Sequence, residues 1–169
     1  MTDMSQPPIN PIGQPLLRRE DARFLTGAGQ YTDDVVLPGQ SYGFFLRSPY
    51  AHARIKSINL DKAKAAPGVL HIFTGADLAE AKVGGLPCGW LITSKDGTPM
   101  KEPPHPILAI GKARYVGDQV AMVIAETLEQ AKNAAEAVEV DYEVLDAVVD
   151  MRTAAKGPAL HEAAPDNHC

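Results

Sequence analysis

Apolar residues recur along the chain with the periods of strands and short helices, and glycine and proline separate the runs. Aromatic or β-branched runs between turn residues are typical of strands, as is the alternation of Val with Glu and Asp near residue 140. The run at 119–125 is apolar almost throughout, which indicates a buried strand. Strands are therefore predicted over residues 42–47, 53–60, 69–73, 119–125 and 138–144.

Short helical segments lie between these strands, and several begin with capping residues. Thr74 with Asp77, and Thr127 with Gln130, match the capping box, in which two side chains three positions apart bond each other's backbone. Asp61 is expected to cap a further short helix. Helices are predicted over residues 19–26, 61–66, one turn from 74, and 128–137, with Phe24 and Leu25 facing inward on the first and Leu128, Ala131, Ala135 and Val138 forming the apolar stripe of the last.

Two strand, helix, strand patterns with short connections predict an α+β fold, a mixed sheet covered by a few short helices. The strand at 42–47 is expected to pair with the strand at 53–60 across the short connection 48–52. The order of the other strands does not follow from the pattern.

A long excursion, residues 82–106, separates the two blocks and contains five prolines. Loops of this length without regular structure usually serve a site or an interface. Its apolar residues Leu86, Trp90, Leu91 and Ile92 have two interpretations, a small core beneath the loop or contact with a partner or ligand.

The segment before the first helix is proline-rich and is predicted to be an extended arm over residues 1–17. A basic cluster follows it, Arg18, Arg19 and Arg23, with Glu20 and Asp21 in between. This mixture indicates a salt-bridged surface or an interface.

Composition limits the classes of function. A chain of 169 residues that is 45% hydrophobic and 22% charged fits one soluble domain with a real core. A net charge of -5 argues against a nucleic-acid partner. No apolar run is long enough for a membrane segment, and the first fifteen residues do not resemble a secretory signal, so a cytoplasmic location is predicted.

The candidate metal and cofactor residues have structural interpretations that are preferred. Gly27 and Gly29 lack the preceding strand and third glycine of a dinucleotide fingerprint. His52 and His71 have no second ligand nearby in the sequence. The remaining metal hypothesis is an ion shared near the carboxyl terminus by His161, His168 and Cys169.

Two further candidates concern acid/base and thiol chemistry. Asp33 and Asp34 suit a turn or helix cap better than an acid/base pair. Cys88 suits a small apolar filler better than a nucleophile, since the only histidine of the loop is His105. Two cysteines are too few for a disulfide framework, an iron–sulfur cluster or a four-Cys zinc site.

Several strings in fixed order resemble the large subunit of the xanthine dehydrogenase and aldehyde oxidase family. They are RREDARFLTGAGQYTDD, LRSPYAHARI, FTGADL, RYVGDQVAMVIAET, AEAVEVDYEVLDAVVD and HEAAPDN. The resemblance covers about residues 12–167 and is nearest to the aerobic carbon monoxide dehydrogenase branch. Tyr50 and Gln119 depart from it, standing where His and Pro are common.

The resemblance implies an α/β hammerhead domain over residues 18–155, with the long loop at 82–106 and a tail, 156–169, leading toward an absent cofactor domain. The family's catalytic Glu and its pterin-binding residues lie beyond residue 169. No catalytic, cofactor-binding or metal residue is therefore expected here. Molybdopterin, FAD and 2Fe-2S clusters are expected in partner chains, namely a molybdenum cofactor chain and the flavin and iron–sulfur subunits.

By the same resemblance, this domain packs on the cofactor domain and a loop approaches the substrate funnel. The funnel candidates, taken from their position between the FTGADL and YVGDQVA strings, are Leu86, Pro87, Cys88, Gly89, Trp90, Leu91 and Ile92. The interface candidates are Arg18, Arg19, Arg23 and Phe24.

The leading hypothesis is a non-catalytic hammerhead domain or small subunit of a molybdopterin-dependent hydroxylase or dehydrogenase that oxidises a small heteroaromatic, aldehyde or similar substrate. In this reading the chain is part of an oxidoreductase and has no catalytic centre of its own. The alternative is a stand-alone interaction or binding module that keeps the fold without activity. A third possibility is a thiol enzyme that uses Cys88.

Overall fold

A computed structural model describes residues 12, 13, 15 and 17–168. The chain divides into two compact units, Met1–Gln40 and Ser41–Cys169, each of which is described by itself. Most of the predicted arm, residues 1–11, 14 and 16, lies outside the described residues. In the part that the structure describes, no helix has the length and hydropathy that a membrane span requires.

The first unit contains the helix α1, Asp21–Leu25, and the 3-10 helix η1, Thr32–Asp34. The short helix that ends before a glycine is confirmed, and Gly27 takes the left-handed conformation with φ +72°. Leu25 is 87% exposed, so the prediction that it faces inward is wrong. A five-residue helix has too little surface to bury two adjacent side chains, and only Phe24 finds a partner, the ring of Tyr31.

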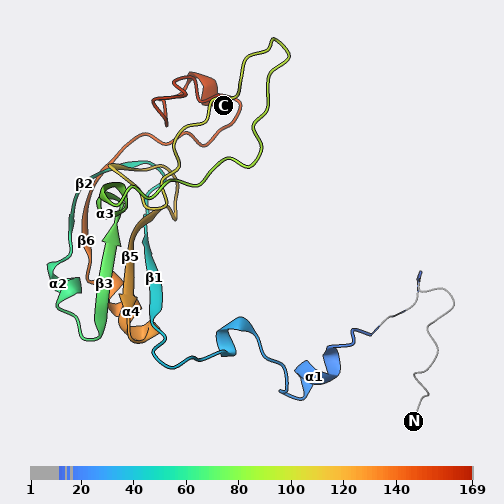
Figure 1. Cartoon of the computed structure of the whole chain (residues 1–169). Coiled ribbons are helices and arrows are strands. Elements are labelled where there is room, and N and C mark those ends of the chain that lie inside the picture. Colours follow the sequence, from blue (N-terminus) through green and yellow to red (C-terminus); the bar gives the residue numbers. More distant parts are fainter. Residues whose placement is uncertain (1–11, 14, 16, 169) are drawn as a thin grey trace. The chain divides into compact units, whose positions relative to one another are not determined.

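The second unit contains two three-stranded sheets (Figure 1). One has the order β1-β5-β3, with β1 at Tyr42–Arg47, β5 at Gln119–Ala125 and β3 at Val69–Thr74. The other has the order β4-β2-β6, with β4 at Lys112–Ala113, β2 at Ala53–Asn59 and β6 at Glu139–Val144. The α+β class with few short helices is confirmed, and the described strand pairs are antiparallel.

The predicted pairing of the strands at 42–47 and 53–60 is wrong. β1 pairs with β5, and β2 pairs with β4 and β6. Backbone bonds hold the connection between β1 and β2 as a corner: Ser48 N–H donates to the Asp118 carbonyl, and Gly117 N–H donates to the Ser48 carbonyl. Leu145 N–H donates to the His52 carbonyl beyond the corner. The connection therefore leads the chain from one sheet to the other.

The predicted helices are present as α2, Asp61–Lys64, α3, Gly75–Glu80, and α4, Leu128–Glu136, and the 3-10 helix η2, Ala154–Lys156, follows. The capping box at α3 is confirmed, since Thr74 and Asp77 bond reciprocally. At α4 only half of the predicted box is present, because Thr127 Oγ1 accepts from Gln130 N–H while Gln130 Oε1 accepts from the Thr127 hydroxyl and not from its backbone. Asp61 does not cap α2. Asn59 does so in its place, because its Oδ1 accepts the Asp61 N–H at 2.9 Å.

The core lies between α2, α4 and the β1-β5-β3 sheet, and it is built largely from small side chains: Ala63, Ile72, Ala121, Val123, Ala134, Ala135 and Val138. Alanines let α4 approach the sheet closely. Of the predicted stripe, Leu128 is 42% exposed, and Ala134 is buried instead. Val144, expected to share the buried face of its strand, is 62% exposed.

We expect Asp77→Asn to destabilise the protein at neutral pH and to have little effect in acid. The carboxylate of Asp77 accepts bonds from the hydroxyl and backbone N–H of Thr74, both at 2.6 Å, and these bonds hold its pKa below the usual 3.8. Because the folded pKa is the lower one, the stabilisation is complete above the unfolded pKa and is lost as pH falls through the folded pKa. Urea unfolding of both proteins from about pH 7 to about pH 2 measures this. A constant difference would contradict it.

Candidate functional site

The long loop, residues 82–106, is more ordered than its composition indicates. Its base is closed by a bond from Leu86 N–H to the His105 carbonyl at 2.8 Å. Near its tip, Thr93 forms a bridge with Pro99, and Met100 N–H donates to the Ile92 carbonyl at 3.0 Å. Backbone hydrogen bonds therefore link the two arms of the loop, and residues 86–92 lie in the first of these arms.

The apolar side chains of this segment face solvent. Trp90 is 79% exposed, and Leu86, Leu91 and Ile92 are each more than half exposed. They do not fill a core beneath the loop within this chain, so that interpretation is wrong. Contact with a partner or a ligand remains the prediction that accounts for them.

Cys88 is half-buried and held at both its backbone and its thiol. Its N–H donates to Glu102 Oε1 at 3.0 Å, and its Sγ donates to the Trp90 carbonyl at 3.4 Å. Neither contact supplies a base that would generate a thiolate. The geometry thus supports a role in shaping the loop next to Trp90.

A cavity of about 300 Å³ lies at the base of the loop. Its walls come from the proline-rich end of the loop, the segment that leads into β5 and the carboxyl-terminal tail, which lie side by side in Figure 1. The residues with chemistry that line it are His105, Arg114, Tyr115, Asp118 and His161. The rings of His105 and Tyr115 meet edge to face at 6.5 Å.

Arg114 ties this cavity together. Its backbone N–H donates to Asp118 Oδ2 at 2.9 Å, and its Nε donates to the Leu160 carbonyl at 3.0 Å, which fixes the tail. Burial, and then the positive charge of Arg114, lower the pKa of His161. Burial and the charge of Asp118 raise the pKa of Tyr115. Arg114 and Asp118 act on the pKa of His161 in opposite directions.

The cavity brings together residues that are far apart in the sequence. His161 was expected near His168 and Cys169, but His168 contacts Asp166, and Cys169 lies outside the described residues. The segment RYVGDQ contributes to the family resemblance, and none of its residues is among the predicted site residues. Its charged residues around Gly117, whose φ of +93° turns the chain toward β5, are the sequence feature nearest to this cavity, and they do not point to His105 or His161.

The other histidines are structural. His52 is 4% exposed, and its Nδ1 bonds the Asp146 carbonyl at 2.8 Å, which joins β2 to the segment after β6. His71 packs its exposed ring against Phe73. Over residues 12, 13, 15 and 17–168, no three His, Cys, Asp or Glu side chains form a group that could hold a metal ion.

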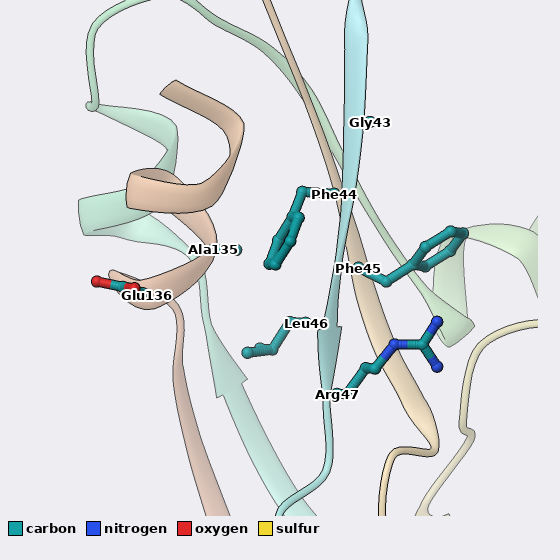
Figure 2. Close-up of a pocket in the computed structure, with 7 residues that line it drawn as sticks. All are labelled: Gly43, Phe44, Phe45, Leu46, Arg47, Ala135 and Glu136. Carbon is teal, nitrogen blue, oxygen red and sulfur yellow. The ribbon is translucent and has the colours of Figure 1, made fainter. Parts of the chain in front are cut away.

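A second hollow, about 430 Å³, lies beside β1, an edge strand of its sheet. Figure 2 shows Phe44 and Leu46 pointing toward Ala135 on α4, and Phe45 and Arg47 pointing the other way. The Arg47 guanidinium covers the Phe45 ring and donates to the Gly117 carbonyl at 2.9 Å. This groove is open and mainly apolar in its lining.

The interface candidates of the first unit are exposed, apart from Phe24. Phe24 stacks on Tyr31 at 5.1 Å, and the Arg23 guanidinium lies 5.1 Å from the centre of its ring. Among the described residues, Arg18, Arg19 and Arg23 form no ion pair with Glu20 or Asp21, so the salt-bridged interpretation is wrong. The interface interpretation stays a prediction.

Residues 26–146 match the family model described as aldehyde oxidase and xanthine dehydrogenase, a/b hammerhead domain. The chain is 38% identical over 164 residues to the nicotine 6-hydroxylase large subunit of Paenarthrobacter nicotinovorans, covering 95% of this chain and 19% of that protein. Quinoline 2-oxidoreductase from Pseudomonas putida 86 has a similar structure, with a TM-score of 0.70, 43% identity and coverage of 85% and 18%. The Cu,Mo-CO dehydrogenase also has a similar structure, with a TM-score of 0.67 and 40% identity, and the match covers 85% of this chain and 17% of that one. The chain thus spans less than a fifth of these relatives.

Proposed function

Because the chain belongs to the aldehyde oxidase and xanthine dehydrogenase family and contains its α/β hammerhead domain, as the sequence motifs predicted, we propose that it packs on the domain that binds the molybdenum cofactor of such an enzyme. One relative is named as a Cu,Mo enzyme, and another as a large subunit. We place the cofactor in another part of the assembly, as the family resemblance implies. No chemical step is assigned to this chain.

The observation that carries the proposal is the exposure of the segment Leu86–Ile92. The loop exposes Trp90, at 79%, and three large aliphatic side chains, Leu86, Leu91 and Ile92, to water. Such surfaces mark contacts with a partner or a substrate channel. The open groove beside β1 supports the same conclusion, since it offers a second apolar face for packing.

We assign the segment Leu86–Ile92 to the wall of the substrate funnel. An apolar wall fits a small heteroaromatic substrate, of the kind for which the nicotine and quinoline relatives are named. It also excludes water from the place where substrate is oxidised.

The surface around α1 is assigned to the electron-transfer partners, the FAD and 2Fe-2S subunits. Arg18, Arg19 and Arg23 are exposed and have no ion pair among the described residues. Leu25 and Leu37 are exposed apolar side chains of the same unit. Arginine beside apolar side chains is a composition enriched at protein interfaces.

Trp90, the single tryptophan of the chain, supplies the test of the proposal. The chain is labelled with 5-fluorotryptophan and mixed with the separately expressed cofactor-domain protein of the same organism. We expect a complex in which the fluorine signal of Trp90 shifts and becomes inaccessible to a soluble quencher. Trp90→Ala should weaken assembly by roughly 30-fold, because buried tryptophans are common interface hot spots.

The matched control is Leu70→Ala, which removes an exposed apolar side chain on β3 and should leave assembly unchanged. In the complex formed at saturating chain concentration, Trp90→Ala should lower kcat/KM for quinoline with unchanged cofactor content, which separates the funnel role from packing. Failure to associate, or equal effects of the two variants, would reject the proposal. The first of these outcomes would favour a stand-alone binding module.

A further inference from the structure

The proposed packing on the cofactor domain does not account for the shape and charge of the cavity at the base of the long loop. It encloses about 300 Å³, the lower end of the range for small-molecule sites, so it suits a ligand of a single ring. Three prolines, Pro103, Pro104 and Pro106, and Ala109 form its apolar walls. Hydrogen bonds on both sides fix its walls, since the backbone bond from Leu86 N–H holds the loop and the side-chain bond from Arg114 Nε holds the tail.

The polar groups of the cavity favour an anion. Asp118 is its single carboxylate and is 7% exposed, with Oδ2 already accepting the Arg114 N–H. Arg114 uses only Nε for the tail, and its two Nη groups bond no other residue in the described part of the chain. A guanidinium with free Nη groups binds a carboxylate through paired, charge-assisted bonds.

The two histidines complete this arrangement. His105 and His161 line the same cavity from opposite segments of the chain, the loop and the tail. The charges that act on His161 are those of Arg114, His105, Lys112 and, with opposite sign, Asp118. Arg114 and Lys112 repel a cation and Asp118 opposes them, so an anionic group in the cavity is attracted both by the ring N–H groups and by these two cations.

We propose that this cavity binds a small organic carboxylate with a flat apolar body, the carboxylate held by Arg114 and His161 and the body lying between Pro103, Pro104 and Ala109. This site goes beyond the packing and funnel roles and does not depend on either. Ligand binding would clamp the tail to the loop, because His161 of the tail would hold the carboxylate while Pro103 and Pro104 of the loop contact the apolar body.

Titration of the 15N-labelled full chain with benzoate, followed by NMR chemical shifts, tests this site. We expect saturable shifts at His105, Tyr115 and His161, and at least tenfold weaker binding of the neutral benzamide and the cationic benzylammonium. Arg114→Gln should lower benzoate affinity at least tenfold. His161→Gln should lower it about threefold.

Arg152→Gln is the matched control, since it removes an exposed arginine that pairs with Asp150, and it should leave the affinity within twofold. Equal binding of benzoate and benzamide, absence of saturation, or unchanged affinity in Arg114→Gln would overturn the proposal. If Arg114→Gln unfolds because the Leu160 bond is lost, His161→Gln and the benzamide comparison still decide. In that case His161→Gln has to bind benzoate more weakly than the wild type does, and the wild type has to bind benzamide more weakly than benzoate.

Discussion

Ile72→Ala is expected to lower the free energy of unfolding by about 2–5 kcal/mol. Ile72 is 4% exposed at the centre of β3 and packs in the cluster that joins the sheet to α4. The other buried members of the cluster are alanines together with Val123 and Val138, and partly buried side chains such as Phe44 and Leu46 pack against it. Alanine and valine side chains are too short to fill the space that the deletion leaves, so a cavity term adds to the lost burial. Urea denaturation followed by circular dichroism measures the change.

Leu70→Ala is the matched control on the same strand. Leu70 is 55% exposed, and its truncation should change stability by no more than about 0.5 kcal/mol. If the two variants lose similar stability, the core is not where the structure puts it. A fall in the slope with denaturant for Ile72→Ala alone would instead indicate that unfolding is no longer two-state.

The elements that could be predicted from the sequence are those that local patterns determine. The capping box at Thr74 and the side-chain cap at Thr127 fix where α3 and α4 begin, because the partners of each cap lie within one turn. The apolar run of β5 is buried on one face and half-buried or buried on the other, and β5 is the central strand of its sheet, as its composition predicts. These features need no knowledge of the rest of the chain.

Strand pairing could not be predicted in this way. A short connection between two strands usually makes a hairpin, yet here the segment between β1 and β2 is bound to residues about 70 positions away, such as Gly117 and Asp118. Those bonds arise only when β5 enters the sheet beside β1. The information lies in long-range contacts, which no local pattern contains.

Of the two candidate sites, the loop could be predicted from local sequence and the cavity could not. The loop could be identified because Trp90 and its neighbours are too apolar for their surroundings, and the family resemblance placed them near a funnel. The cavity at the base of the loop could not, since His105, Asp118 and His161 come from three segments that long-range contacts bring together, among them the bond from Arg114 Nε to the Leu160 carbonyl. A histidine with no second candidate ligand or catalytic residue nearby in the sequence does not indicate that it lines a cavity with distant residues.

Gly75→Val is expected to cost about 3 kcal/mol or more and to disturb the loop base as well as the fold. A Cβ on Gly75 would lie 2.7 Å from the Ala109 carbonyl oxygen and 3.0 Å from that of Leu108, so backbone, and not a flexible side chain, would have to move. Ala109 also lines the cavity, and its N–H bonds the Gln119 carbonyl at the start of β5. A shift of residues 108–110 therefore reaches β5 and the cavity wall together.

Gly84→Val is the matched control for this effect, because a Cβ on Gly84 meets nothing within 4 Å and its φ is not positive. We expect Gly84→Val to unfold like the wild type within about 0.5 kcal/mol, while Gly75→Val loses stability and shows altered amide shifts at Ala109, Tyr115 and His161. Thermal and urea unfolding measure the first effect, and 15N NMR measures the second. Normal stability of Gly75→Val would mean that α3 does not press against the 108–110 segment, and the cavity would lose the support that holds its wall in place.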